Sequence, residues 1–134
     1  MPMSNANPNM TATNLTEALG RFLDVDVARY KLVATNLANI DTPGYQTRDL
    51  DFRSELRRIA QTENSDGTGA DLFFPVVHAV PGLVTRPDGN NVSVDRESLL
   101  LAEAQMKFNL GVQLLKDQFH TISLAINSGG GSSS

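Results

Sequence analysis

Residues 34–52 read ATNLANIDTPGYQTRDLDF, and this stretch decides how the rest of the chain can be arranged. Asn36 and Asn39 are three residues apart, so they share one face of a helix. That helix has to stop before Pro43-Gly44, because a residue that precedes proline is disfavoured in the α region. A helix stop explains the Pro-Gly pair but not the paired asparagines. We therefore expect the asparagines to hydrogen-bond backbone or a neighbouring helix and to set its register, with Tyr45 anchoring the departing chain.

The helix that leads into this stretch is expected over residues 11–41. Its apolar positions recur at alternating spacings of four and three, which is typical of a helix packed lengthwise against another helix. The polar Asp26 interrupts this apolar seam. The seam consists of Leu15, Leu19, Leu23, Asp26, Tyr30, Val33, Leu37 and Ile40.

A second long helix is expected over residues 95–127, with Asp95 as its cap. It has the same spacing, and Gly111 inside it would permit close approach of another helix. Its seam consists of Leu101, Gln105, Phe108, Val112, Leu115, Phe119, Ile122 and Ile126. Further apolar residues lie off this seam, namely Leu99, Leu100, Met106, Leu110, Leu114 and Leu124. One partner helix covers one stripe, so the surplus predicts additional helices from other copies or other proteins.

The middle of the chain, residues 42–94, is rich in Gly, Pro, Asp and Asn and is expected to be an irregular insertion. A short helix is predicted near residues 51–61. Residues 72–80 are β-prone but are interrupted by Pro75, so they predict at most an edge strand. Asp88-Gly89 predicts a hairpin-like turn, and the alternation at 92–94 suggests a brief strand after it.

The predicted fold class is mainly α, with the two long helices paired as a coiled-coil hairpin that forms one domain. Residues 1–10 and the Gly/Ser-rich residues 128–134 are expected to be flexible tails. The alternative is a three- or four-helix bundle with further helices in the middle. The composition of residues 42–94 argues against that alternative, since it cannot supply long helices.

Composition excludes several functional classes. The 134 residues include no cysteine, so disulfide scaffolds, thiolate metal sites and cysteine nucleophiles are excluded. The net charge of −4 and the 6% aromatic content argue against a nucleic-acid partner. No stretch approaches the roughly 20 apolar residues of a membrane helix, and the N-terminus lacks the features of a secretory signal peptide.

No catalytic constellation is present, so we expect no enzyme activity, cofactor, metal or small-molecule substrate. His78 and His120 are interpreted as packing or surface residues. The basic cluster of Arg53, Arg57 and Arg58 has acidic neighbours, Asp49, Asp51 and Glu55, and is interpreted as a solvated helix face.

The 34–52 stretch resembles the N-terminal signature of the flagellar rod and hook family. The pattern is carried by Asn36, Asn39 and the tetrad Thr42, Pro43, Gly44 and Tyr45. Two further segments are similar to short, proximal rod members of that family. These segments contain Arg48, Asp49, Asp51 and Phe52, and then Asp88, Gly89, Asn90 and Asn91. Gln46-Thr47 departs from the usual pattern of a basic and a small residue.

The resemblance implies a structural subunit of the flagellar basal body, located in the periplasmic rod. The terminal helices would form the inner layer of a torque-transmitting tube with a central export channel. Type III export without a cleaved signal peptide is implied. The implied partners are neighbouring copies, FliE, the FliF ring, other rod proteins and the export gate. The alternatives are a cytoplasmic helical adaptor, another short proximal rod protein or, with no supporting motif, a small enzyme.

Overall fold

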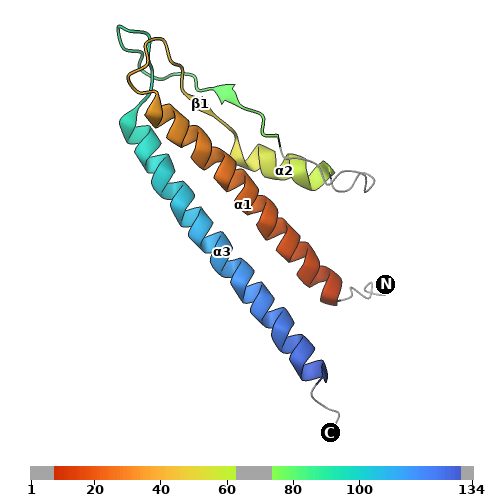
Figure 1. Ribbon diagram of the computed structural model, residues 1–134. Helices are drawn as coiled ribbons and strands as arrows, with labels where there is room; N and C mark the ends of the chain where they lie inside the picture. The colour runs from red at the N-terminus through yellow and green to blue at the C-terminus, as the bar shows by residue number, and fades with distance from the viewer. Residues whose placement is uncertain (1–7, 63–73, 131–134) are drawn as a thin grey trace.

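The computed structural model describes residues 8–62 and 74–130. Two long helices dominate it, α1 (Pro8–Ala38) and α3 (Val94–Gly130). They run antiparallel and side by side, and they form the largest contact between elements (Figure 1). This confirms the predicted mainly α class with paired terminal helices. Parts of the two expected tails, 8–10 and 128–130, are helical, and the remainder of those tails lies outside the described residues.

The middle of the chain folds back along α1. It contains β1 (Arg48–Asp49), α2 (Phe52–Thr62) and β2 (His78–Ala79). The two strands form an antiparallel pair in which Arg48 faces Ala79 and Asp49 faces His78. Both α2 and β1 contact α1, so α1 is covered by α3 on one side and by the middle on another (Figure 1).

The local signals at the element starts differ partly from expectation. Ser93, rather than Asp95, caps α3, because its hydroxyl oxygen accepts the Arg96 N–H at 3.3 Å. The strand expected at 92–94 is absent, since α3 already begins at Val94. Asp51 caps α2 by accepting the Ser54 N–H at 2.9 Å.

The α1–α3 packing is close at Gly111. A Cβ at this position would lie 2.7 Å from Leu23 Cδ2. The absence of a side chain therefore lets the two helices approach, as the sequence suggested. Six hydrophobic side chains are buried in the described part of the chain: Leu19, Val25, Val33, Leu50, Val92 and Ala104.

Candidate functional site

Asn36 is the centre of a buried polar cluster where the C-terminal end of α1 meets the N-terminal end of α3. Its side-chain nitrogen donates to the Arg48 carbonyl at 2.8 Å and to Glu97 Oε2 at 3.0 Å. Its side-chain oxygen accepts the Arg48 N–H at 3.1 Å and the Tyr45 hydroxyl at 2.9 Å. The amide thus uses both donors and both acceptor sites, and it joins α1, β1 and α3. We call this region the polar junction.

Tyr45 leaves the end of α1 and turns back onto it. Its hydroxyl reaches Asn36, and its carbonyl accepts the Asn91 N–H at 3.3 Å. Burial raises the pKa of Tyr45, so its phenol stays protonated and remains a donor at neutral pH.

Asn39 has a more local role than Asn36. Its side chain donates to the Thr35 carbonyl at 2.8 Å and accepts from the Thr42 hydroxyl at 3.1 Å, both at exposed positions. Its own carbonyl accepts from Asn90 Nδ2 at 2.8 Å. The two asparagines of the signature therefore have different roles. The Asn36 side chain bonds to other elements, whereas the Asn39 side chain bonds locally at the end of α1.

Asn90 and Asn91 connect the Asp88-Gly89 turn to the Pro43-Gly44 turn that follows α1. Asn90, which is fully buried, also donates to the Thr42 carbonyl at 2.9 Å. Asn91 Oδ1 accepts the Thr47 N–H at 2.7 Å, and its nitrogen donates to Gln46 Oε1 at 2.9 Å. The Gln46-Thr47 departure noted in the sequence is thus part of the junction.

Two glycines let these turns touch. Gly44 has a φ of 77° and Gly89 a φ of 86°, values that favour glycine. The Gly44 N–H donates to the Asp88 carbonyl at 2.9 Å. A Cβ on Gly89 would lie 3.2 Å from the Gly44 Cα, so any side chain there would push the turns apart.

Asp49 links three elements through ion pairs. It accepts two hydrogen bonds from Arg29 of α1, each at 3.1 Å, and one from Arg96 of α3 at 2.7 Å. Arg96 also contacts Glu97 at 2.6 Å. Burial alone would raise the pKa of Asp49, but the bonds from Arg29 and Arg96 hold it below its ordinary value.

The interpretation of the acidic residues near Arg53 as a solvated face is wrong for two of them. Asp49 is 4% exposed and Glu55 is 3% exposed. Glu55 accepts from Arg58 at 2.6 Å and from the Val76 N–H at 2.9 Å, so it fastens α2 to the returning chain. Both carboxylates are buried because each has cationic and backbone donors.

Phe52 belongs to the second family segment and lies under the helix pair. Its ring meets Phe22 of α1 edge-to-face, with centroids 5.3 Å apart. The Lys107 ammonium of α3 lies 4.1 Å from the centroid of the same ring. Phe52 thus connects α2 to both long helices.

The predicted seams are only partly buried. Leu19 and Val33 of α1 are buried, and Tyr30 is 42% exposed. Intermediate exposure is found for Leu23, Leu37, Ile40, Leu101, Val112, Leu115 and Ile122. Phe108, Phe119 and Ile126 of α3 are exposed. The α3 seam therefore has uncovered apolar side chains toward its C-terminal end.

Sequence reasoning missed several junction residues, above all Arg29, Arg96 and Glu97. A signal for Arg29 was present, because it lies seven residues before Asn36 and so shares its helix face. Phe22 lies seven residues earlier again. Helix α1 therefore carries a second stripe, which faces α2 and β1, beside the one that faces α3.

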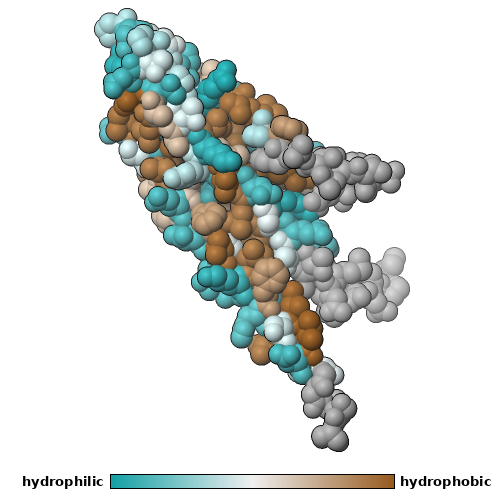
Figure 2. Space-filling view, in the orientation of Figure 1, coloured by the Kyte–Doolittle hydropathy of each residue, from teal (hydrophilic) through white to brown (hydrophobic). Residues whose placement is uncertain are grey.

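A separate apolar surface runs along the side of α3 that faces away from α1. We call it the outer stripe, and its residues are 43–74% exposed. The outer stripe consists of Leu99, Met106, Leu110, Leu114 and Leu124. Apolar surface is prominent along the helix pair in the space-filling view as well (Figure 2).

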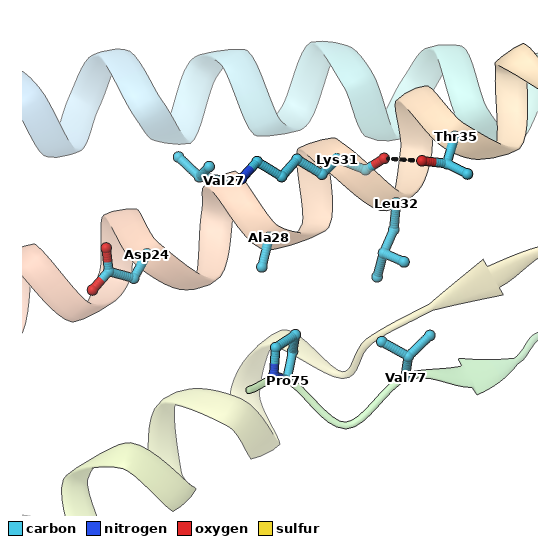
Figure 3. Close-up of a pocket in the computed structure, with 8 residues that line it drawn as sticks. All are labelled: Asp24, Val27, Ala28, Lys31, Leu32, Thr35, Pro75 and Val77. Carbon is cyan, nitrogen blue, oxygen red and sulfur yellow. Dashed lines mark hydrogen bonds between the residues drawn. The ribbon is translucent and has the colours of Figure 1, made fainter. Parts of the chain in front are cut away.

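Two hollows flank α1. The first, of about 570 Å³, lies between α1 and the stretch around Pro75 and Val77. Ala28 and Leu32 point into it, whereas the Lys31 side chain runs back along α1 toward Val27 (Figure 3).

The second hollow, of about 550 Å³, lies between α1 and α3, and we call it the interhelical hollow. Tyr30 and Phe108 are its aromatic walls, and Asp26 lies within it. Asp26 is 2% exposed, and its Oδ1 has no hydrogen-bond partner. Burial raises the pKa of Asp26 to about 6, although Lys107 and Arg29 oppose the rise. A buried carboxylate with one unbonded oxygen weakens the α1–α3 contact at neutral pH.

Within residues 8–62 and 74–130, no group of three or more His, Asp or Glu side chains is arranged to hold a metal ion. In the same ranges, no helix is both long and apolar enough to cross a bilayer. A saturated polar junction beside uncovered apolar helix faces is the arrangement of a structural subunit that assembles with others.

Comparison with known proteins identifies the family to which this structural subunit belongs. The chain is 31% identical over 122 residues to the flagellar basal body rod protein FlgB of Salmonella typhimurium, covering 80% of this chain and 88% of that protein. It is 28% identical over 127 residues to FlgB of Bacillus subtilis, covering 89% and 95% respectively. It is 28% identical over 122 residues to FlgB of Yersinia enterocolitica, covering 80% and 89%. No protein-family model matches.

These relatives are structural components of the flagellar basal body rod. The chain belongs to the family of the flagellar basal body rod protein FlgB.

Proposed function

We propose that this chain is a subunit of the proximal rod and that it assembles into a helical tube through α1 and α3. In this tube the paired helices form the inner layer around an export channel, and the tube transmits torque across the periplasm. The observation that carries the proposal is the outer stripe of α3. Five large apolar side chains on the face opposite α1 are 43–74% exposed in the monomer, and burying them would stabilise an assembly.

The proposed partners are neighbouring copies of the chain, FliE, the FliF ring, other rod proteins and the export gate. The polar junction supports this role because it holds the two helices at a set angle and register. The signature residues Asn36, Tyr45, Asn90 and Asn91 serve the subunit itself, and the helix faces remain for contacts with partners.

Deletion of the gene in the bacterium that encodes this chain tests the proposal. The deletion should abolish swimming in soft agar, and plasmid-borne wild type should restore it. Phe119→Asp should restore much less swimming at equal protein levels, since Phe119 is 56% exposed in the subunit and is available for an intersubunit contact.

Val84→Asp is the matched control, because Val84 is 88% exposed but lies outside the helix pair. It should swim like wild type. Normal swimming of the deletion strain, together with absence of the chain from purified basal bodies, would overturn the proposed function.

A further inference from the structure

A subunit inside the proposed helical tube meets one copy on each side, and a standard interface takes about 800 Å² from each partner. The side chains of the outer stripe and the aromatic walls of the interhelical hollow, Tyr30 and Phe108, are 42–74% exposed and supply apolar surface for such contacts.

Two apolar surfaces of the helix pair are available for these contacts. The outer stripe projects as a ridge of leucine and methionine side chains. The interhelical hollow is concave, with Tyr30 and Phe108 as half-exposed walls. A ridge and a hollow of similar chemistry are complementary in shape, whereas two ridges or two hollows are not.

The two surfaces lie on different sides of α3. The hollow involves Ala104, Gln105, Phe108 and Asn109, and at 3.6 residues per turn these positions are roughly 160° around the axis from the outer stripe. One copy can therefore present its stripe to a second copy while its own hollow receives a third. Such a contact is heterologous, and it continues into a filament unless the rotation closes a ring.

Charge also favours a second copy as the occupant of the hollow. Asp117 lies within the outer stripe, one turn after Leu114, and it is exposed. Lys31 lines the hollow and is exposed. When the stripe of one copy lies in the hollow of the next, the Asp117 carboxylate would therefore be near the Lys31 ammonium of that next copy.

We propose that the outer stripe of α3 in one copy packs head to tail into the interhelical hollow of the next copy. This inference rests on the proposed function, since it specifies which faces of the subunit meet. It also explains why Tyr30 and Phe108, two large aromatic side chains, remain half exposed in the subunit: the next copy covers them.

Mixing two variants of the full chain tests the proposal. Leu110→Glu disables the stripe, and Tyr30→Glu disables the hollow. Sedimentation velocity should show concentration-dependent association of the wild type beyond a dimer, and a monomer for each variant alone. An equimolar mixture should form a one-to-one dimer and stop there, because each variant retains one of the two surfaces. Val84→Glu should associate like wild type, and circular dichroism should show equal helicity for all chains.

Three results would overturn the head-to-tail contact. These are a mixture that stays monomeric, a wild type that stops at a dimer, and a wild type that stays monomeric at every concentration. If stripe paired with stripe, the wild type would stop at a dimer and Tyr30→Glu alone, whose stripe is intact, would still dimerise. Each of these results leaves the proposed function standing if the deletion strain is non-motile, so the two proposals fail separately.

Discussion

At the polar junction, side chains such as Asn36, Asn90 and Glu97 are buried and hydrogen-bonded to other elements. Toward the C-terminal end of α3, by contrast, Phe119, Leu124 and Ile126 are each more than half exposed. The junction satisfies its polar groups within one chain, whereas the other end of the helix pair, which we call the distal end, leaves apolar groups in water. The difference shows that one end of this subunit is satisfied within the monomer, whereas the other end is the place where the proposed assembly would bury apolar surface.

The largest expected effect comes from breaking the junction at its centre. Asn36→Ala removes four hydrogen bonds and leaves the Tyr45 hydroxyl, the Arg48 backbone and Glu97 without this partner. We expect the free energy of unfolding to fall by about 3–5 kcal/mol. Urea denaturation followed by circular dichroism, at a concentration where the chain is monomeric, measures the loss.

Asn39→Ala is the control for this prediction. Its side-chain bonds are local and exposed, so the expected loss is under about 1 kcal/mol. Equal losses for the two variants would mean that the bonds between elements contribute no more than a helix-end bond, and the contrast between junction and distal end would fail.

A smaller effect of opposite sign is expected at Asp26, between the two regions. The pKa of its carboxyl is about 6 in the folded chain against 3.8 for an ordinary Asp, so the folded state binds the proton more tightly. Stability from this group is present at low pH and is lost as the pH rises from about 4 to 6. Asp26→Asn should raise the free energy of unfolding by roughly 1–3 kcal/mol above pH 6.

The pH dependence distinguishes this effect from a change in packing. Lys107, Arg29 and Glu103 face Asp26, and both chains keep them, so the difference between wild type and variant isolates Asp26. Below about pH 4 the two chains should unfold at the same urea concentration. A gain in stability that persists at low pH would refute the electrostatic explanation.

The smallest effect on the monomer is expected at the distal end. Leu124→Gln replaces a 56% exposed side chain, and the free energy of unfolding should change by no more than about 0.5 kcal/mol. Leu19→Gln, at a 9% exposed position of α1, should cost about 2–4 kcal/mol in the same assay. A large loss for Leu124→Gln would show that the outer stripe is already covered within the monomer.

The alternation of three and four along the chain was sufficient to predict both long helices and their pairing, because that spacing gives each helix a continuous apolar stripe along its length. The turn at Asp88-Gly89 and the anchoring role of Tyr45 were also accessible, since Gly supplies a positive φ and Pro fixes φ locally. Local chemistry of this kind depends on residues that are adjacent in the sequence.

The ion pairs of the junction could not be predicted in the same way. Asp49 meets Arg29 and Arg96, which are 20 and 47 residues away, and no local pattern specifies such a meeting. Only the apolar seam of α1 was predicted, and the second stripe of this helix was not. That stripe carries Phe22, Arg29 and Asn36, and the Asp49 partner of Arg29 lies on another element, 20 residues away.

The clamp between α2 and the returning chain has a consequence for how this fold tolerates change. Glu55 accepts the Val76 N–H, and Arg58 donates to the Phe74 carbonyl at 2.6 Å, so the chain on both sides of residues 63–73 is fixed to one helix turn. Lengthening a chain segment between two fixed points costs only about 0.6 kcal/mol for each doubling of its length. Residues can therefore be inserted between α2 and Phe74 without disturbing the α1–α3 pair. Proteins that share this helix pair could thus differ in the size of the segment inserted at this point.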